Sequence, residues 1–219
     1  MEKEKLKRII EFLETQENKT PNSKGNLRWK LIFNEPLTEE ELTVDGDLNL
    51  NKTPLTSLPK GLKVRGYLSL SYTKITSLPE DLKVVGSLYL DYSFIKSLPK
   101  RLKVGGDFNL AHSKITSLPE GLKVNHSLYL NDCEDLISLP KGLKVGGWLK
   151  LPNTKITSLP EDLEVGKSLN LRFCTELTSL PKGLKVGGDL YIRGAYLAKY
   201  TDEELREMIK PGFIKGEIY

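Results

Sequence analysis

The sequence predicts a solenoid, a fold of stacked turns in which each turn adds one short strand to a parallel β-sheet. The tripeptide Ser-Leu-Pro recurs in steps of 20, 20, 20, 21, 20 and 21 residues, starting at Ser57, Ser77, Ser97, Ser117, Ser138, Ser158 and Ser179. Each copy lies in a longer unit such as Gly66 to Val84, in which a Leu-x-Leu pair precedes the Ser-Leu-Pro. Self-similarity at such a fixed period indicates stacked repeats that bury apolar side chains against their neighbours.

Residues 1–36 predict an N-terminal cap made of a helix and a short strand. Residues 2–15 carry one apolar helical face, formed by Leu6, Ile9, Ile10 and Leu13. After a polar loop over 16–26, an alternating pattern predicts a strand with the apolar residues Leu27, Trp29, Leu31 and Phe33. We expect this segment to cover the open core of the first turn, and a helix presented to a partner is the alternative.

Residues 37–192 predict the solenoid itself, with roughly eight turns. In each turn a two-residue alternation points a pair of residues inward, and these pairs are Leu48/Leu50, Leu68/Leu70, Leu88/Leu90, Phe108/Leu110, Leu128/Leu130, Leu149/Leu151, Leu169/Leu171 and Leu190/Ile192. The return path, Ser-Leu-Pro-x-x-Leu-Lys-Val, is too short and too rich in Pro and Gly for a helix. We therefore expect extended chain on the side opposite the sheet.

A small polar residue follows each strand at a fixed inward position, three residues after the second apolar one. This position holds Thr53, Thr73, Ser93, Ser113, Cys133, Thr154 and Cys174. Hydroxyl groups there can satisfy backbone groups at the bend. The two cysteines read as inward structural thiols, and because they lie two turns apart, at about 10 Å, we expect no disulfide between them.

Two columns of charge run along the repeats. Directly after each proline the sign alternates, in Lys60, Glu80, Lys100, Glu120, Lys141, Glu161 and Lys182, and we interpret this column as register control. A second column is mostly basic and comprises Lys63, Lys83, Lys103, Lys123, Lys144, Glu164 and Lys185. Solvated surface is the simpler interpretation of the second column, and an acidic partner or a nucleic acid is the alternative.

Residues 193–219 predict a C-terminal cap. Thr201 and Glu204 have the spacing of a capping box, which begins a helix that we expect to end near Ile209. Pro211 and Gly212 stop it, and residues 213–219 read as a terminal strand or arm. A small docking appendage is the alternative.

The composition disfavours a nucleic-acid binder and a membrane protein. The net charge of +4 comes from 33 basic and 29 acidic residues that form no dense basic patch. The first five residues are largely charged, so we expect no signal peptide, and no apolar run approaches the roughly 18 residues of a membrane span. With two cysteines and no export signal, a cytoplasmic location is expected.

The repeat unit over residues 66–79, GYLSLSYTKITSLP, resembles the short Ser-Leu-Pro-type leucine-rich repeats of bacteria and their phages. It is similar to the repeat domains of effectors of the YopM and IpaH kind. Two departures are Thr, Ser or Cys in place of the usual Asn, and a different return segment. With 27 residues after Ile192, we expect no ubiquitin-ligase domain.

This resemblance covers about residues 37–192 and implies a leucine-rich-repeat solenoid with its parallel sheet on the concave face. It also implies a non-catalytic scaffold for protein–protein interaction, such as a bacterial or phage effector or inhibitor that acts on a host protein.

We find little in the sequence that predicts catalysis. His112 and Asp132 occupy the same position in neighbouring turns, which is the geometry of an oriented general base, but the adjacent Ser113 and Cys133 point inward. An ordinary surface pair is the simpler interpretation. No Cys/His spacing fits a zinc site and no glycine-rich phosphate loop precedes a helix, so we expect no metal, no cofactor and no enzyme.

The outward residues of the strands are the candidate binding surface, because they vary between turns while the inward framework is fixed. Tyr, Trp and Arg among them are typical of binding hot spots. The predicted partner-binding residues are Tyr67, Tyr72, Tyr89, Asp91, Tyr92, Asp107, His112, Tyr129, Asp132, Trp148, Lys150, Arg172, Phe173 and Tyr191. We expect a monomer that binds a partner protein, with a homo-oligomer formed through the caps or a sheet edge as the alternative.

Overall fold

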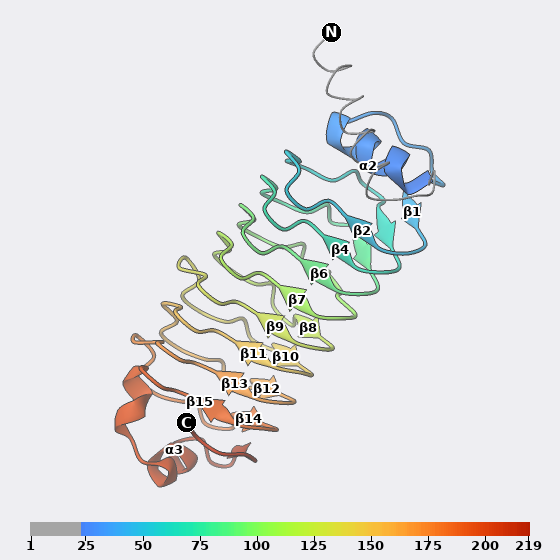
Figure 1. Cartoon of the computed structure of the whole chain (residues 1–219). Helices are drawn as coiled ribbons and strands as arrows, with labels where there is room; N and C mark the ends of the chain where they lie inside the picture. The colour runs from blue at the N-terminus through green and yellow to red at the C-terminus, as the bar shows by residue number, and fades with distance from the viewer. Residues whose placement is uncertain (1–22) are drawn as a thin grey trace.

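A computed structural model of the chain describes residues 23–219, which form an elongated parallel β-solenoid (Figure 1). The helix predicted over residues 2–15 lies outside the described residues. Strands of two residues each recur in every turn and stack along the long axis of the molecule, from β2 near the N-terminal end to β15 near the C-terminal end.

The first sheet has eight strands, all paired in parallel, in the order β15-β13-β11-β9-β7-β6-β4-β2. Its strands are β2 (Leu48–Asn49), β4 (Leu68–Ser69), β6 (Leu88–Tyr89), β7 (Phe108–Asn109), β9 (Leu128–Tyr129), β11 (Leu149–Lys150), β13 (Leu169–Asn170) and β15 (Leu190–Tyr191). The predicted strand cores are therefore confirmed. The 21-residue steps do not shift the register, since Leu128 still pairs with Leu149 and Leu169 with Leu190.

The return segment forms a second parallel sheet, which the sequence analysis did not anticipate. Its strands are β1 (Thr43–Val44), β3 (Lys63–Val64), β5 (Lys83–Val84), β8 (Lys123–Val124), β10 (Lys144–Val145), β12 (Glu164–Val165), β14 (Lys185–Val186) and β16 (Phe213–Ile214). Single bridges through Val104 join its three-stranded and five-stranded parts. In each turn the valine is buried and its neighbour faces outward, so an extended return was correctly predicted but its strand pairing was missed.

The core lies inside the stacked turns and repeats with them. The inward pair of each strand is buried, as Leu68 and Leu70 illustrate at 0% exposure. The valine of the return and the leucine of Ser-Leu-Pro complete the filling of each turn. Phe108 replaces the usual leucine and is also fully buried, so the stack accommodates one larger side chain there.

The strand predicted around Leu27–Phe33 is wrong, because these residues belong to helix α2 (Ser23–Phe33). The alternating pattern contains two pairs four residues apart, and such pairs share a face in a helix. Leu27 and Leu31 join the hydrophobic core, while the rings of Trp29 and Phe33 stack with centroids 3.9 Å apart. In Figure 1 α2 lies at the N-terminal end of the stack.

The C-terminal segment contains the predicted capping box. Helix α3 (Asp202–Met208) follows a 3₁₀ turn, η1 (Tyr196–Lys199), and its first turn is closed by reciprocal bonds between Thr201 and Glu204. The terminal strand or arm predicted over residues 213–219 contains a two-residue strand, β16, which pairs with β14, and a single bridge from Ile218 to Leu190. Arg206 on α3 donates to the carbonyls of Ile214 and Gly216 and fixes the helix against this strand.

The inward polar position of each turn has the role predicted for it. The hydroxyls of Thr53, Thr73 and Thr154 donate to the carbonyl of the second strand leucine in their own turn, at 2.6–2.8 Å. Cys133 and Cys174 are buried free thiols that donate instead to the leucine carbonyl of the preceding turn, at 3.1 and 3.2 Å.

The alternating charge column does not behave as we expected. Its members are exposed and take part in none of the ion pairs formed by residues 23–219. Two of those ion pairs instead lie in the basic column, where Glu164 contacts Lys144 at 2.8 Å and Lys185 at 3.0 Å. The single acidic residue of that column is thus shared by the lysines on both sides of it.

Candidate partner-binding face

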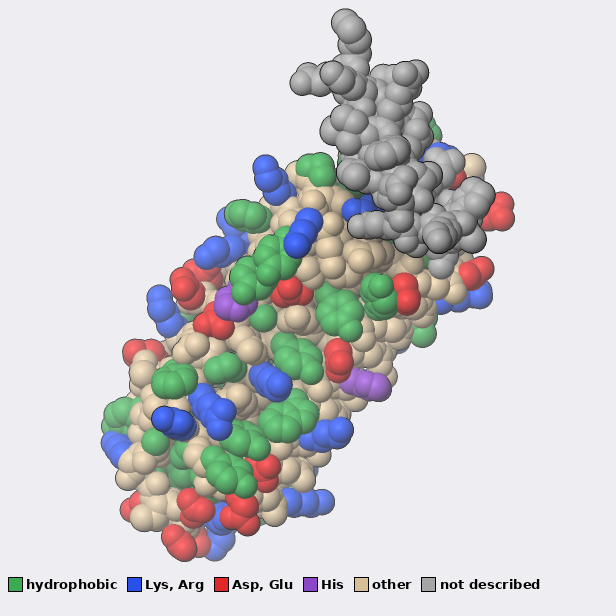
Figure 2. Space-filling model, in the orientation of Figure 1, with side chains coloured by type: hydrophobic (Ala, Val, Ile, Leu, Met, Phe, Trp, Pro, Cys, Tyr) green, Lys and Arg blue, Asp and Glu red, His purple; other side chains and the backbone are tan. Residues whose placement is uncertain are grey.

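The outward residues of the eight-stranded sheet, with the residue directly before and directly after each strand core, form the surface that we call the strand face. Figure 2 shows this side of the molecule, where aromatic and charged side chains lie among polar ones along the stack. Nine of the predicted site residues lie on it, namely Tyr67, Tyr89, Asp91, Asp107, Tyr129, Trp148, Lys150, Arg172 and Tyr191.

The other five predicted residues follow the strands and form an edge column. The column comprises Lys52, Tyr72, Tyr92, His112, Asp132, Asn153 and Phe173, and each has a left-handed backbone with φ between 55° and 60°. Glycine and asparagine tolerate this conformation best, whereas bulky side chains rarely adopt it. The last turn does use glycine at the equivalent position, Gly194 with φ 74°. Aromatic side chains in this column therefore need a compensating interaction.

Stacking along the edge column supplies that interaction. The rings of Tyr72 and Tyr92 lie nearly parallel with centroids 4.5 Å apart, and Tyr92 stacks on His112 at 4.3 Å. Lys52 lies over the exposed face of Tyr72, 5.7 Å from the ring centroid. Desolvation, with Tyr92 as a neighbour, raises the pKa of Tyr72. From Lys52 to His112 the column is thus a continuous ladder of stacked side chains, whereas the ring of Phe173 lies against Gly194 of the last turn.

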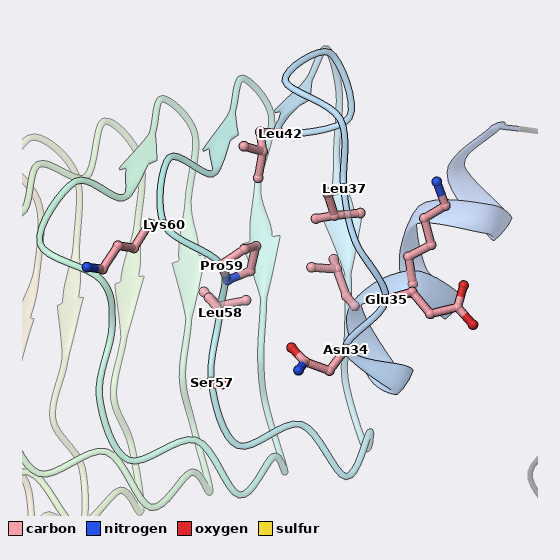
Figure 3. A pocket seen from close by; sticks show the side chains of 10 residues that line it. Asn34, Glu35, Leu37, Leu42, Ser57, Leu58, Pro59 and Lys60 are labelled. Atoms are coloured by element: carbon pink, nitrogen blue, oxygen red, sulfur yellow. The ribbon is translucent and has the colours of Figure 1, made fainter.

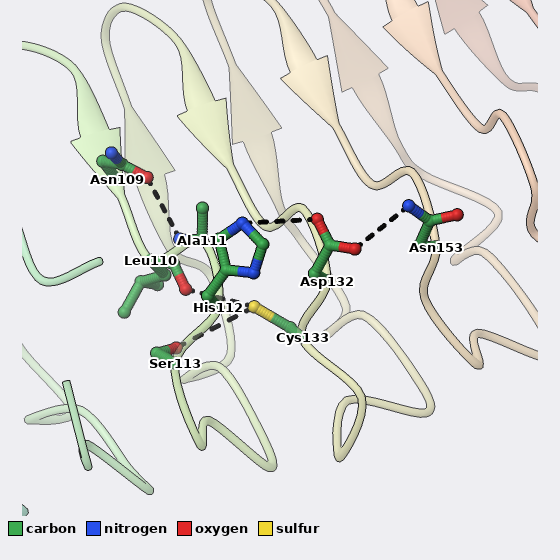
Figure 4. Close-up of polar contacts among 8 residues, drawn as sticks. All are labelled: Asn109, Leu110, Ala111, His112, Ser113, Asp132, Cys133 and Asn153. Carbon is green, nitrogen blue, oxygen red and sulfur yellow. Dashed lines mark hydrogen bonds and ion pairs between the residues drawn. The ribbon is translucent and has the colours of Figure 1, made fainter. Parts of the chain in front are cut away.

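A polar chain continues the ladder, as Figure 4 shows. His112 Nε2 lies 3.5 Å from Asp132 Oδ2, and Asn153 donates to Asp132 Oδ1 at 3.0 Å. Below this chain the Cys133 thiol is buried, bonded to the Leu110 carbonyl and 3.8 Å from Ser113 Oγ. Burial raises the pKa of Cys133 to about 11, so the thiol stays protonated at neutral pH. His112 and Asp132 therefore have no activated nucleophile beside them.

The N-terminal half of the strand face is aromatic and acidic, and its carboxylates accept hydrogen bonds from neighbouring turns. Tyr67 and Tyr89 contact edge to face with centroids 6.0 Å apart. Asp107 Oδ1 accepts the Ser127 amide at 2.9 Å, while Asp91 Oδ1 accepts from Ser71 Oγ at 2.6 Å. The sequence analysis treated these positions as unconstrained, but Asp107 also ties one turn to the next.

The C-terminal half carries what we call the cation–aromatic cluster, made of Tyr129, Trp148, Lys150, Arg172 and Tyr191. Lys150 Nζ lies between two rings, 5.0 Å from the centroid of Tyr129 and 5.2 Å from that of Trp148. The Arg172 guanidinium lies 4.9 Å from the centroid of Tyr191, which in turn stacks on Trp148 at 5.7 Å. All five side chains are half-buried, which holds them in a defined arrangement.

Tyr219 extends this cluster and was missed by the sequence analysis. Its ring stacks on Tyr191 with centroids 5.1 Å apart. The signal was present, because FIKGEIY at 213–219 repeats the pattern KVGGDLY at 185–191 as a partial extra turn. The register confirms this reading, since Lys185 pairs with Phe213 and Leu190 bridges to Ile218. Desolvation and the hydrogen bond that Tyr191 donates to Asp189 raise the pKa of Tyr191.

A pocket lies away from the strand face, where α2 meets the first turn (Figure 3). Its lining includes Leu31, Leu37, Leu42 and Leu58, with Lys30 and Glu35 at its rim. Lys30 is paired with Glu41 at 2.6 Å. The lining comes from the end of α2, the segment after it and the first Ser-Leu-Pro, so we interpret the pocket as the seam between helix and solenoid.

Comparisons with known proteins add no relative: no family model matches the chain, and no curated protein matches it. Among residues 23–219 no three His, Cys, Asp or Glu side chains are grouped so as to hold a metal ion. The helices of the same part of the chain are all too short or too polar to cross a bilayer.

Proposed function

We propose that the chain is a non-catalytic, cytoplasmic scaffold of the leucine-rich-repeat class that binds a partner protein through its strand face. The resemblance of its repeats to bacterial and phage proteins supports a host protein as the target class. The helical segments at the two ends act as caps in this proposal, and the sheet that carries the strand face is the concave side.

The observation that carries the proposal is the cation–aromatic cluster. Each of its five residues stands at an outward position where packing would accept a small polar side chain, such as the Ser87 or Asn109 found in other turns. Aromatic side chains at these positions bury area in a protein interface at a low cost in side-chain entropy, and Arg is enriched with them in binding hot spots. Because none of these five side chains is needed to fill the core, their presence supports a role in binding.

The basic column of the second sheet supports a nucleic-acid partner less well. Its lysines are exposed, but Glu164 forms ion pairs with two of them and no aromatic side chain alternates with them. Single-stranded nucleic acids are held by cations together with aromatic stacking platforms. We therefore keep a protein as the proposed partner.

A capture experiment from bacterial lysate tests the proposal. The variant Tyr89→Ala/Tyr129→Ala/Trp148→Ala removes strand-face rings, and the matched control Phe94→Ala/Tyr196→Ala/Phe213→Ala removes three exposed rings elsewhere. We expect wild type and control to retain one protein in stoichiometric amount and the strand-face variant to lose it. Equal capture by all three, with circular dichroism showing each folded, would place the binding site off the strand face.

A further inference from the structure

The cations of the C-terminal half of the strand face have no acidic partner within the chain. Lys150, Arg172 and Arg193 lie on three successive turns, and none of them forms an ion pair with any residue of 23–219. Asp189 and Glu217 are the acidic residues at the C-terminal end of this half, and the two oxygens of Asp189 accept from Tyr191 and from the Glu217 amide. Neither carboxylate forms an ion pair with the three cations, which therefore remain available to a partner.

The cluster also fixes where these charges point. Lys150 lies over two rings and Arg172 over one, so the long side chains lose part of their freedom before any partner arrives. The Nε atom of Arg172 is buried in the strand face, so its guanidinium is held close to the sheet and does not extend freely into solvent.

We propose that this half of the strand face binds an acidic segment of the partner protein, with carboxylates placed on Lys150, Arg172 and Arg193. The inference rests on the proposed function and adds the chemistry of the partner to it. Adjacent turns are about 4.8 Å apart, so carboxylates on neighbouring residues of one face of a helix or strand reach successive cations. The acidic Asp91 and Asp107 at the other half repel the same segment and so set its direction.

Two other occupants fit less well. Bases of a nucleic acid need ring faces on which to stack, but the faces in the cluster are covered by Lys150, by Arg172 and by one another. A second copy of this chain would offer Asp91 and Asp107 to the cations, but an oxygen of each already accepts a hydrogen bond, from Ser71 Oγ and from the Ser127 amide. An acidic segment needs to contact the cations only, whereas a dimer would require the whole strand face to be complementary to itself.

Peptide selection tests the inference, with a displayed library of random 12-residue peptides as the probe. The test variant is Lys150→Glu/Arg172→Glu, and the milder Lys150→Gln/Arg172→Gln is carried in parallel in case the first does not fold. The matched control, Lys83→Glu/Lys123→Glu, makes the same change in net charge on the second sheet, where both lysines are exposed. This control separates the effect of charge at the two substituted positions from the effect of the net charge of the whole chain.

We expect wild type and control to enrich peptides rich in Asp and Glu, and the test variant to lose that preference. The Kd of the best acidic peptide should rise about ten-fold or more in the Glu variant and stay within about two-fold in the control. Affinity should also fall as salt is raised, since the contact is ionic.

Five results would overturn the inference, and they separate it from the proposed function. Enriched peptides without acidic residues that still require Tyr129 and Trp148 would leave the proposed function standing alone. Acidic peptides that bind the Glu variant normally would place the charge recognition elsewhere. Peptides that ignore the strand face would count against both proposals. A dimer that the Glu variant dissociates, or a labelled thymidine 12-mer bound in place of peptide, would make a second copy or a nucleic acid the occupant.

Discussion

Side chains of the edge column carry two opposing contributions to stability at the same backbone position. A left-handed conformation costs a residue other than glycine roughly 1–2 kcal/mol. Each aromatic stack contributes about 0.5–1.5 kcal/mol beyond its buried area. Tyr92 stacks on both Tyr72 and His112, whereas Lys52 has one cation–π contact at an exposed end. The net contribution of the side chain to stability should therefore be favourable at Tyr92 and close to zero or unfavourable at Lys52.

Asparagine substitutions test this balance, because Asn tolerates the left-handed region and already stands there as Asn153. We expect Lys52→Asn to leave the urea midpoint unchanged or raise it, since it loses one weak contact and relieves strain. Tyr92→Asn should lower the free energy of unfolding by about 1 kcal/mol, because two stacks outweigh the relief. A Tyr92→Asn variant as stable as Lys52→Asn would mean that the stacks contribute nothing.

Cys133 predicts a pH dependence of stability. Its pKa is raised from 9.0 to about 11 by burial, so the native state keeps a proton that the unfolded state loses first. The contribution is fully present below pH 9 and is lost as the pH rises toward about 11. We expect the free energy of unfolding to fall more steeply over this window in wild type than in Cys133→Ser, a comparison that cancels the lysines, the tyrosines and Cys174. If the two curves run parallel, burial does not raise the pKa of Cys133.

At the scale of the element, the helix at residues 23–33 shows why one boundary was misjudged. A two-residue alternation and a four-residue spacing share members, so Leu27, Leu31 and Phe33 satisfy both templates. Such a segment becomes a strand only if the edge of another strand is available for pairing. Seven residues of sequence do not show whether such an edge exists. Strands inside the repeats were predictable because each has an equivalent one turn away, and that redundancy fixes register.

Helix α3 depends on its capping box in a way that can be measured locally. Thr201 Oγ1 accepts the Glu204 amide at 3.2 Å, and the Glu204 carboxylate accepts the Thr201 amide at 2.8 Å. Thr201→Ala should cost about 1 kcal/mol, which makes the amides of 202–208 exchange with solvent about five-fold faster. Thr178→Ala, an exposed threonine without such a bond, should leave those rates unchanged. Equal rates in both variants would show that the cap does not limit opening of the helix.

On the scale of the whole molecule, the sequence predicted the stack but not how its surface residues interact. The outward positions of the strand face were identified from their variability, and the aromatic members of the cluster were named. The hydrogen bonds of Asp107 and the ring stacks of the edge column were not, because both depend on contacts between turns that no single repeat encodes. Asn153 and Gly194 in the edge column were the signal for its backbone conformation.

The C-terminal strand predicts how the stack ends. Residues 213–219 pair with both sheets: Phe213 donates to the Leu184 carbonyl at 2.9 Å and Tyr219 to the Leu190 carbonyl at 2.9 Å. Ending the chain after Gly212 would expose the edges of β14 and β15, and an uncovered parallel edge is a template for pairing with another chain. We expect the shortened protein to self-associate as its concentration rises, as measured by light scattering.

The control for this prediction is Tyr219→Ala, which removes the ring stacked on Tyr191 and keeps the backbone of the strand. It should have the mass of wild type at every concentration, because edge protection comes from backbone pairing and not from the ring. If the shortened protein also keeps the mass of wild type, then β14 and β15 are protected by something other than residues 213–219. The helix α3 would be the first element to test, since it lies next to that strand and is tied to it by Arg206.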